Sequence, residues 1–86
     1  MYEQARRAYY ELFKLPDNQL DRKNWVQAIS LFQTVLDRYP SSHQSYKAAF
    51  SLGLLYRELF KVSGKQEDQQ RALEYFNLVA VRFPVG

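Results

Sequence analysis

A single histidine stands beside two serines, and nucleophilic chemistry would be sought first at this point of the chain. Ser41, Ser42 and His43 follow directly after Pro40. A histidine that activates a serine needs a carboxylate to orient its ring, and no paired carboxylate accompanies this triplet in sequence. We therefore interpret His43 as a solvated or capping residue of an inter-helix turn and assign it no catalysis.

Acidic residues gather at two places where a cation could be sought. One group extends from Asp17 to Asp21, and the other is the pair Glu67 and Asp68. Neither group has the alternating oxygen ligands and the closing glutamate of a calcium loop. The chain also contains no cysteine, so thiolate metal sites are excluded. We expect no metal, no cofactor and no catalytic residue, and we interpret both acidic groups as solvated helix starts.

Composition excludes several other classes of protein. Eighty-six residues suffice for one domain, and 47% apolar with 16% aromatic residues is far too hydrophobic for a disordered segment. The net charge of +3 is scattered, and the longest basic clusters are the pairs Arg6-Arg7 and Arg22-Lys23. Such scatter disfavours a nucleic-acid partner. No run approaches the roughly 18 apolar residues of a membrane span, and the first residues have no signal-peptide character.

Apolar residues at helical spacing predict four helices, while no segment alternates long enough to suggest a strand. The fold class is therefore all-α. The predicted helices cover residues 2–15, 21–39, 42–62 and 66–83. Asp21 can cap the second helix, and Ser41 with Gln44 has the spacing of a reciprocal cap for the third. Pro16 and Pro40 end the first two helices.

Each helix has a predicted buried side. The third helix has apolar residues on more than one face, which indicates a central helix with neighbours on two sides. The predicted buried residues of the second helix are Trp25, Ala28, Ile29, Phe32, Val35, Leu36 and Tyr39, and those of the fourth are Ala72, Leu73, Phe76, Val79 and Phe83.

The chain contains an internal duplication. Residues 25–40 return as residues 69–84 at a shift of 44, and residues 9–15 resemble residues 56–62 at a shift of 47. The chain is thus expected to form two antiparallel helical hairpins in one domain, with repeat 1 at about 2–40 and repeat 2 at about 42–84. The unequal shifts place a three-residue length difference in the first loop, where it is tolerated.

The second copy carries a recognisable set of residues. Its third helix contains Leu52-Gly53 and Tyr56, and its fourth contains Ala72, Phe76 and Val79 followed by Pro84. This pattern resembles the tetratricopeptide repeat, in which a Leu-Gly pair and a Tyr on helix A precede Ala, Phe, a small apolar residue and Pro on helix B. The first copy keeps the helix B residues Ala28, Phe32, Val35 and Pro40, but on helix A only Tyr9 survives.

The loops within each hairpin are about seven to ten residues longer than in a 34-residue repeat, so the repeat is a variant. Residues 36–42 and 52–56 look like the variants found in bacterial envelope proteins. Residues 5–10, the long loop before Trp25 and residues 55–59 resemble the N-terminal helical region of some N-acetylmuramoyl-L-alanine amidases. The resemblance implies a periplasmic or envelope location; the cytoplasm is the alternative, because these residues contain no targeting signal.

In this family the A helices line a concave groove that receives a partner. If that holds here, the partner-binding residues are Arg7, Tyr10, Lys47, Phe50, Leu54 and Arg57, with Tyr10, Phe50 and Arg57 as the main anchors. Each could instead be an ordinary surface or interhelix residue. Arg7 could also form an ion pair with Glu3 or Glu11.

The resemblance implies a non-catalytic scaffold that binds a protein or peptide partner, or positions another domain of its own chain. The alternative is the non-catalytic region of a zinc-dependent amidase whose metal site lies elsewhere. Two repeats leave an apolar end face uncovered, because stacked repeats usually need about three copies or a capping helix. We therefore expect the chain to be part of a longer protein, and we expect the isolated chain to self-associate.

Overall fold

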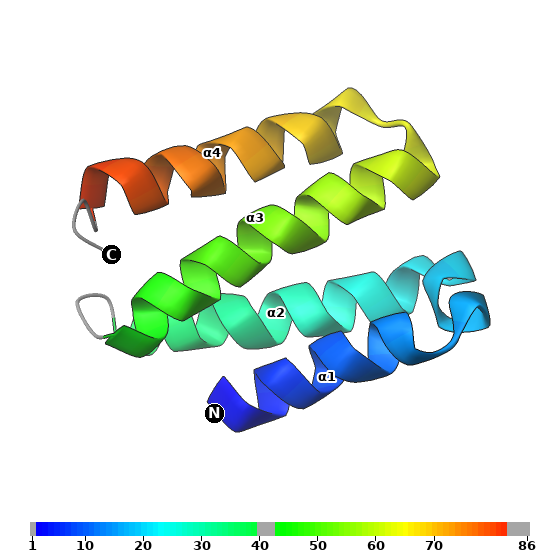
Figure 1. Ribbon diagram of the computed structural model, residues 1–86, viewed down its shortest axis with the longest axis horizontal. Coiled ribbons are helices and arrows are strands. Elements are labelled where there is room, and N and C mark those ends of the chain that lie inside the picture. Colours follow the sequence, from blue (N-terminus) through cyan, green and yellow to red (C-terminus); the bar gives the residue numbers. More distant parts are fainter. Residues whose placement is uncertain (1, 40–42, 83–86) are drawn as a thin grey trace.

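Four α-helices and one short 3-10 helix make up the part of the chain that the computed structural model describes, residues 2–39 and 43–82. The α-helices are α1 (Tyr2–Lys14), α2 (Arg22–Arg38), α3 (His43–Ser63) and α4 (Gln66–Arg82), and the 3-10 helix η1 covers Pro16–Leu20. Successive helices run antiparallel as two hairpins, α1–α2 and α3–α4 (Figure 1). The predicted all-α fold is confirmed.

The helix α3 lies at the centre of the array. It packs against both α2 and α4, whereas α1 packs mainly against α2. The four helices form a slab with principal extents of 35 × 27 × 17 Å (Figure 1). The two-sided apolar pattern of the third helix is explained by this position, because a helix with two neighbours must bury two faces.

Local sequence explains how α1 passes into α2. Leu15 precedes Pro16 and has an extended backbone, as expected for a residue before proline. Pro16 then opens η1, a short 3-10 helix where the sequence predicts a loop. The Asp21 side chain accepts a hydrogen bond of 2.9 Å from the backbone N–H of Lys23, so the predicted cap of α2 is confirmed.

Side chains of α2 and of η1 itself hold the 3-10 helix against its two neighbouring helices. Trp25 is fully buried, and its Nε1 donates a hydrogen bond of 3.0 Å to the carbonyl of Gln19. Asn18 Nδ2 donates to the carbonyl of Glu11 at 2.6 Å, and Asn24 Nδ2 donates to the carbonyl of Asn18 at 2.9 Å. The longer first loop is therefore an ordered connection, because two of its backbone carbonyls, those of Asn18 and Gln19, accept from side chains of α2.

One apolar cluster joins α1, α2 and α3. Aromatic rings meet edge to face within it, as Phe13 does with Trp25 at 5.5 Å and Tyr9 with Phe32 at 6.3 Å between centroids. Its buried members are Ala5, Leu12, Trp25, Ala28, Ile29, Phe32, Val35, Ala48, Leu52, Leu55 and Leu59.

The helices α3 and α4 approach each other closely at Gly53. A Cβ added there would lie 2.7 Å from Cε1 of Phe76, so this position has no space for a side chain. This agrees with the predicted close contact at the Leu-Gly pair. Gly64 ends α3 in the left-handed region with φ of 68°, and its N–H donates to the carbonyl of Phe60 at 2.8 Å.

Two of the predicted core positions are wrong. Leu73 is 64% exposed and Tyr39 is 46% exposed. Leu73 faces outward because no described helix covers that side of α4, and Tyr39 lies at the C-terminal cap of α2, beyond the packed turns. The predicted roles of Pro40, Pro84 and Phe83, and the predicted Ser41 cap, lie outside the described residues.

Candidate protein-binding surface

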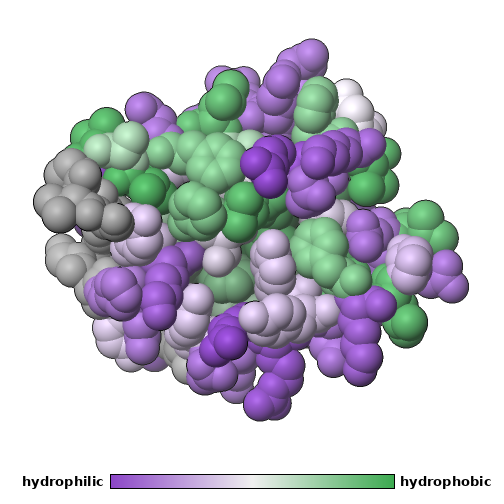
Figure 2. Space-filling view, in the orientation of Figure 1, coloured by the Kyte–Doolittle hydropathy of each residue, from purple (hydrophilic) through white to green (hydrophobic). Residues whose placement is uncertain are grey.

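Four of the six predicted partner-binding residues share one side of α3. Lys47, Phe50, Leu54 and Arg57 recur every three or four positions, which places them on one helix face. Phe50 is 42% exposed, and its ring meets the ring of Phe76 on α4 at 5.9 Å, edge to face. In the view of Figure 2, hydrophobic residues gather over parts of α3 and α4. We call these four residues the α3 face.

The α3 face has basic residues on both sides of Phe50. Lys47 Nζ lies 5.9 Å from the centre of the Tyr2 ring, a cation–π distance between α3 and α1. Arg57 Nε lies 3.6 Å from Oε2 of Glu58, while the Lys61 ammonium lies closer to the same oxygen, at 2.9 Å. The Arg57 side chain is 55% exposed, so its guanidinium is accessible to an incoming carboxylate or aromatic ring.

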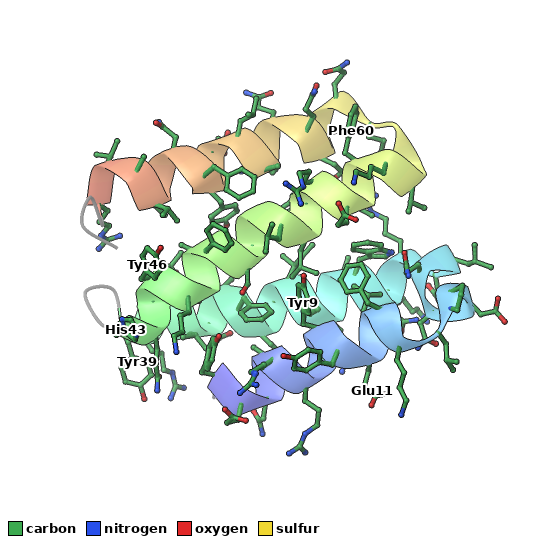
Figure 3. The ribbon with its side chains drawn as sticks, viewed as in Figure 1. Tyr9, Glu11, Tyr39, His43, Tyr46 and Phe60 are labelled. Atoms are coloured by element: carbon green, nitrogen blue, oxygen red, sulfur yellow. The ribbon has the colours of Figure 1, made fainter. Side chains whose placement is uncertain are left out.

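Tyr10 is 59% exposed on α1, the highest exposure among the predicted anchors. The guanidinium of Arg6 lies 5.5 Å from the centre of the Tyr10 ring, and the rings of Tyr10 and Tyr9 meet edge to face. Tyr9 itself lies between α1 and α3 (Figure 3). Burial, and then the nearby Glu58 carboxylate, raise the pKa of Tyr9, so its hydroxyl stays protonated.

Arg7 does not adjoin the α3 face. It lines a groove of about 600 Å³ between α1, η1 and α2, together with Ala8, Glu11 and other residues of these helices. Glu11 points away from α3 in Figure 3. The ion pair described on α1 joins Glu3 to Arg6 at 3.5 Å, three positions apart. It forms in place of the predicted pairs of Arg7 with Glu3 or Glu11.

A polar cluster that the sequence does not predict joins Arg22, Ser63 and Asp68. Asp68 is 2% exposed and accepts hydrogen bonds from Arg22 Nη2 at 3.1 Å and Nη1 at 3.4 Å. Ser63 Oγ donates a third, at 2.6 Å, and accepts one from the Lys65 N–H at 3.2 Å. The interpretation of Asp68 as a solvated helix-start residue is therefore wrong, and this cluster ties the starts of α2 and α4 to the end of α3.

Electrostatics agree with the geometry of this cluster. Burial alone would raise the pKa of Asp68, but the hydrogen bonds from Arg22 and Ser63 and the charge of Arg22 outweigh it, so the pKa is lowered. The carboxylate stays ionised and paired. No local pattern could have revealed this contact, because Arg22 and Asp68 lie in different hairpins.

His43 lies in the first turn of α3, not in the turn before it, and its ring stacks on Tyr46 at 6.2 Å (Figure 3). Among residues 2–39 and 43–82, no group of three or more His, Cys, Asp or Glu side chains could hold a metal ion. Nor does any described helix combine the length and apolar character needed to cross a membrane.

The fold defines a class: an all-α array of helical hairpins. Residues 1–42 match the family model described as tetratricopeptide repeat. This match covers the first hairpin, and repeats of this kind are protein–protein interaction modules. No curated protein and no solved structure matches the chain.

Proposed function

We propose that this chain is a non-catalytic scaffold module whose α3 face, with Tyr10 of α1, binds a protein or peptide partner in the bacterial cell envelope. The proposal rests on the exposed ring of Phe50, which packs edge to face on the ring of Phe76. Aromatic and arginine side chains are the residue types most often found as binding hot spots. Phe50 and Arg57 provide both within two turns of one helix.

The charge of the α3 face indicates the chemistry of the partner. Lys47 and Arg57 are basic, and the carboxylate of Glu58, next to Arg57, lies closer to Lys61 than to Arg57. A segment with an apolar or aromatic residue next to carboxylates fits this arrangement, because the apolar group covers Phe50 and the carboxylates meet the basic side chains.

The location in the envelope is part of the same proposal and rests on the resemblance of residues 36–42 and 52–56 to envelope variants of the repeat. The second candidate, the non-catalytic region of a peptidoglycan amidase, rests on the resemblance of residues 5–10 and 55–59. The sequence of the parent gene beyond Gly86 tests it: a zinc amidase domain in frame supports the candidate, and its absence overturns it.

A capture experiment from the envelope fraction of the parent organism tests the main proposal. Wild-type protein is compared with the double variant Phe50→Ala, Arg57→Ala, and each captured protein is then purified and titrated directly. We expect the double variant to bind about 30-fold more weakly or worse, since each hot spot contributes more than ~1 kcal/mol.

The matched control is Val26→Ala, Lys23→Ala, which removes one exposed apolar and one basic residue from α2 instead. It should bind like wild type. Equal capture by all three proteins, or loss of binding only in the control, would contradict the proposed surface.

A further inference from the structure

The outer side of α4 has the residues of a packed surface but no described neighbour. By the 44-residue shift, Ile29 of α2 corresponds to Leu73 of α4. Ile29 is 6% exposed in the core shared with α3, whereas Leu73 is 64% exposed. Gln66, Leu73 and Asn77 of α4 correspond to Arg22, Ile29 and Gln33 of α2, which contact the second hairpin. Together with Gln69 and Ala80, which lie on the same side of the helix, we call these five residues the α4 face.

The α4 face has no charged residue, although the chain is 24% charged and this face is exposed throughout. The charged residues of α4 lie on its other sides: Glu67, Asp68, Arg71, Glu74 and Arg82. An uncharged stripe along an exposed helix is typical of a surface that is buried in an assembly, since the core of an interface is depleted of charge.

The groove that Arg7 lines is the surface complementary to the α4 face. By the 47-residue shift, Ala8 and Leu12 of α1 correspond to Leu55 and Leu59 of α3, which are buried in the core shared with α2. From α2, Asn24 corresponds to Asp68 of α4.

Leu31 of α2 corresponds to Tyr75 of α4. Asp68 binds Arg22, and the Tyr75 hydroxyl accepts a hydrogen bond of 3.0 Å from Gln33 Nε2. The groove on the first hairpin is therefore equivalent to the surface of the second hairpin that packs against α2. Its complete lining is Gln4, Arg7, Ala8, Glu11, Leu12, Asn18, Asn24, Gln27 and Leu31.

The polar residues of the two surfaces also match. The residue of α4 that corresponds to Arg22 is Gln66, and the groove residue that corresponds to Asp68 is Asn24. In place of the half-buried ion pair between the hairpins, these two surfaces thus carry two neutral amides, which can bond to each other. Asn24 uses its Nδ2 for the carbonyl of Asn18, so its Oδ1 is the acceptor for Gln66 Nε2. Arg7 and Glu11 give the groove opposite charges that cancel.

We propose that a second copy of this chain docks its α4 face into the groove between α1 and α2, as α2 docks on the second hairpin within one chain. The contact joins two different surfaces, head to tail, so a pair of copies still has one free groove and one free α4 face. Such a contact extends into longer assemblies instead of closing as a symmetric dimer. This surface is separate from the α3 face, so either proposal can fail without the other.

Sedimentation of the 86-residue chain over a concentration range of about 10 µM to 1 mM tests the proposal, because self-association by mass action increases with concentration. We expect the mean mass to rise above 10.2 kDa with concentration and to pass beyond the dimer. Two single variants block one surface each: Leu73→Lys on the α4 face and Gln27→Lys in the groove. Both positions are exposed, so the fold tolerates a lysine, and circular dichroism verifies this.

Each blocked variant alone should associate about tenfold more weakly or worse, because the interface would bury an unpaired charge. An equal mixture should form a one-to-one dimer, since each variant retains the surface that the other lacks. Val26→Lys, outside the groove, should assemble like wild type. A constant monomer mass for wild type would overturn the proposal. So would undiminished self-association of Gln27→Lys, which would indicate that two α4 faces pair with each other.

Discussion

The guanidinium of Arg22 holds the carboxylate of Asp68 across 46 positions of sequence, with two hydrogen bonds of 3.1 and 3.4 Å. Arg22 opens α2 of the first hairpin and Asp68 lies in the first turn of α4. The carboxylate is buried while the arginine side chain is 47% exposed. This pair fixes the relative position of the two hairpins at the end of the slab where α2 and α4 begin.

Replacing Arg22 with Met should destabilise the chain by about 1 kcal/mol, near the lower end of the cost of leaving a buried polar group short of a partner. The lower end applies because Arg22 is half exposed and water replaces part of its contribution. Urea unfolding followed by circular dichroism measures the change. The matched control is Arg71→Met, whose ion pair with Glu74 is exposed, and it should change stability by less than about 0.5 kcal/mol. Equal effects would contradict the special role of Arg22.

Stability should depend on pH through Asp68. Its pKa is lowered in the folded chain, so between that pKa and about pH 4 the unfolded chain binds more protons than the folded one. The stabilisation is therefore complete above about pH 5 and is lost as the pH falls through the folded pKa. Unfolding free energies of wild type and Asp68→Asn, measured from pH 2.5 to pH 7, should differ most at neutral pH and converge in acid. Parallel curves would refute this assignment.

Gly53→Ala should loosen the contact between α3 and α4. The new methyl group would lie 2.7 Å from the Phe76 ring, and such overpacking costs about 1–3 kcal/mol. The higher helix propensity of alanine recovers up to about 1 kcal/mol of this. Combining Gly53→Ala with Phe76→Leu should cost less than the sum of the two single changes, because the smaller side chain makes room. Strict additivity in this double-mutant cycle would show that the two positions do not conflict.

Trp25→Phe should release the connection between α1 and α2. Phenylalanine keeps an aromatic ring in the core but cannot donate to the Gln19 carbonyl, and an unsatisfied buried group costs about 1–3 kcal/mol. Amide exchange should accelerate more in residues 17–20 than in α3, because the connection opens locally. Phe32→Leu, a core change on the same helix away from η1, serves as control and should not accelerate exchange in that segment selectively.

Much of the architecture could be predicted from the chain itself. The four helices, the Asp21 cap and the central position of the third helix follow from periodicity and from single residues, because helix formation depends on neighbours three or four positions apart. The duplication indicated two hairpins, and the match of residues 1–42 to the tetratricopeptide repeat agrees with that interpretation. The close approach at Gly53 was also expected, and the space found there explains why the residue is glycine.

The candidate surface was predicted only in part. Spacing placed Lys47, Phe50, Leu54 and Arg57 on one face of α3, since four residues on one helix share a face whatever the tertiary fold. Spacing could not determine that Arg7 lies in the groove with Ala8 and Glu11, because this depends on how α1 is rotated against α2.

By itself the sequence determined which residues form helices, where those helices end and which residues repeat, because these depend on local backbone energetics and on apolar spacing. Only the tertiary structure decided that Asp68 is buried against Arg22, that Pro16–Leu20 forms an ordered 3-10 helix, and that Leu73 faces outward where Ile29 faces inward. The duplicated residues are similar, but their neighbours are not: α2 is covered by α3, and no described helix covers the same side of α4. The burial of a residue therefore depends on which helices pack against it as well as on its side chain.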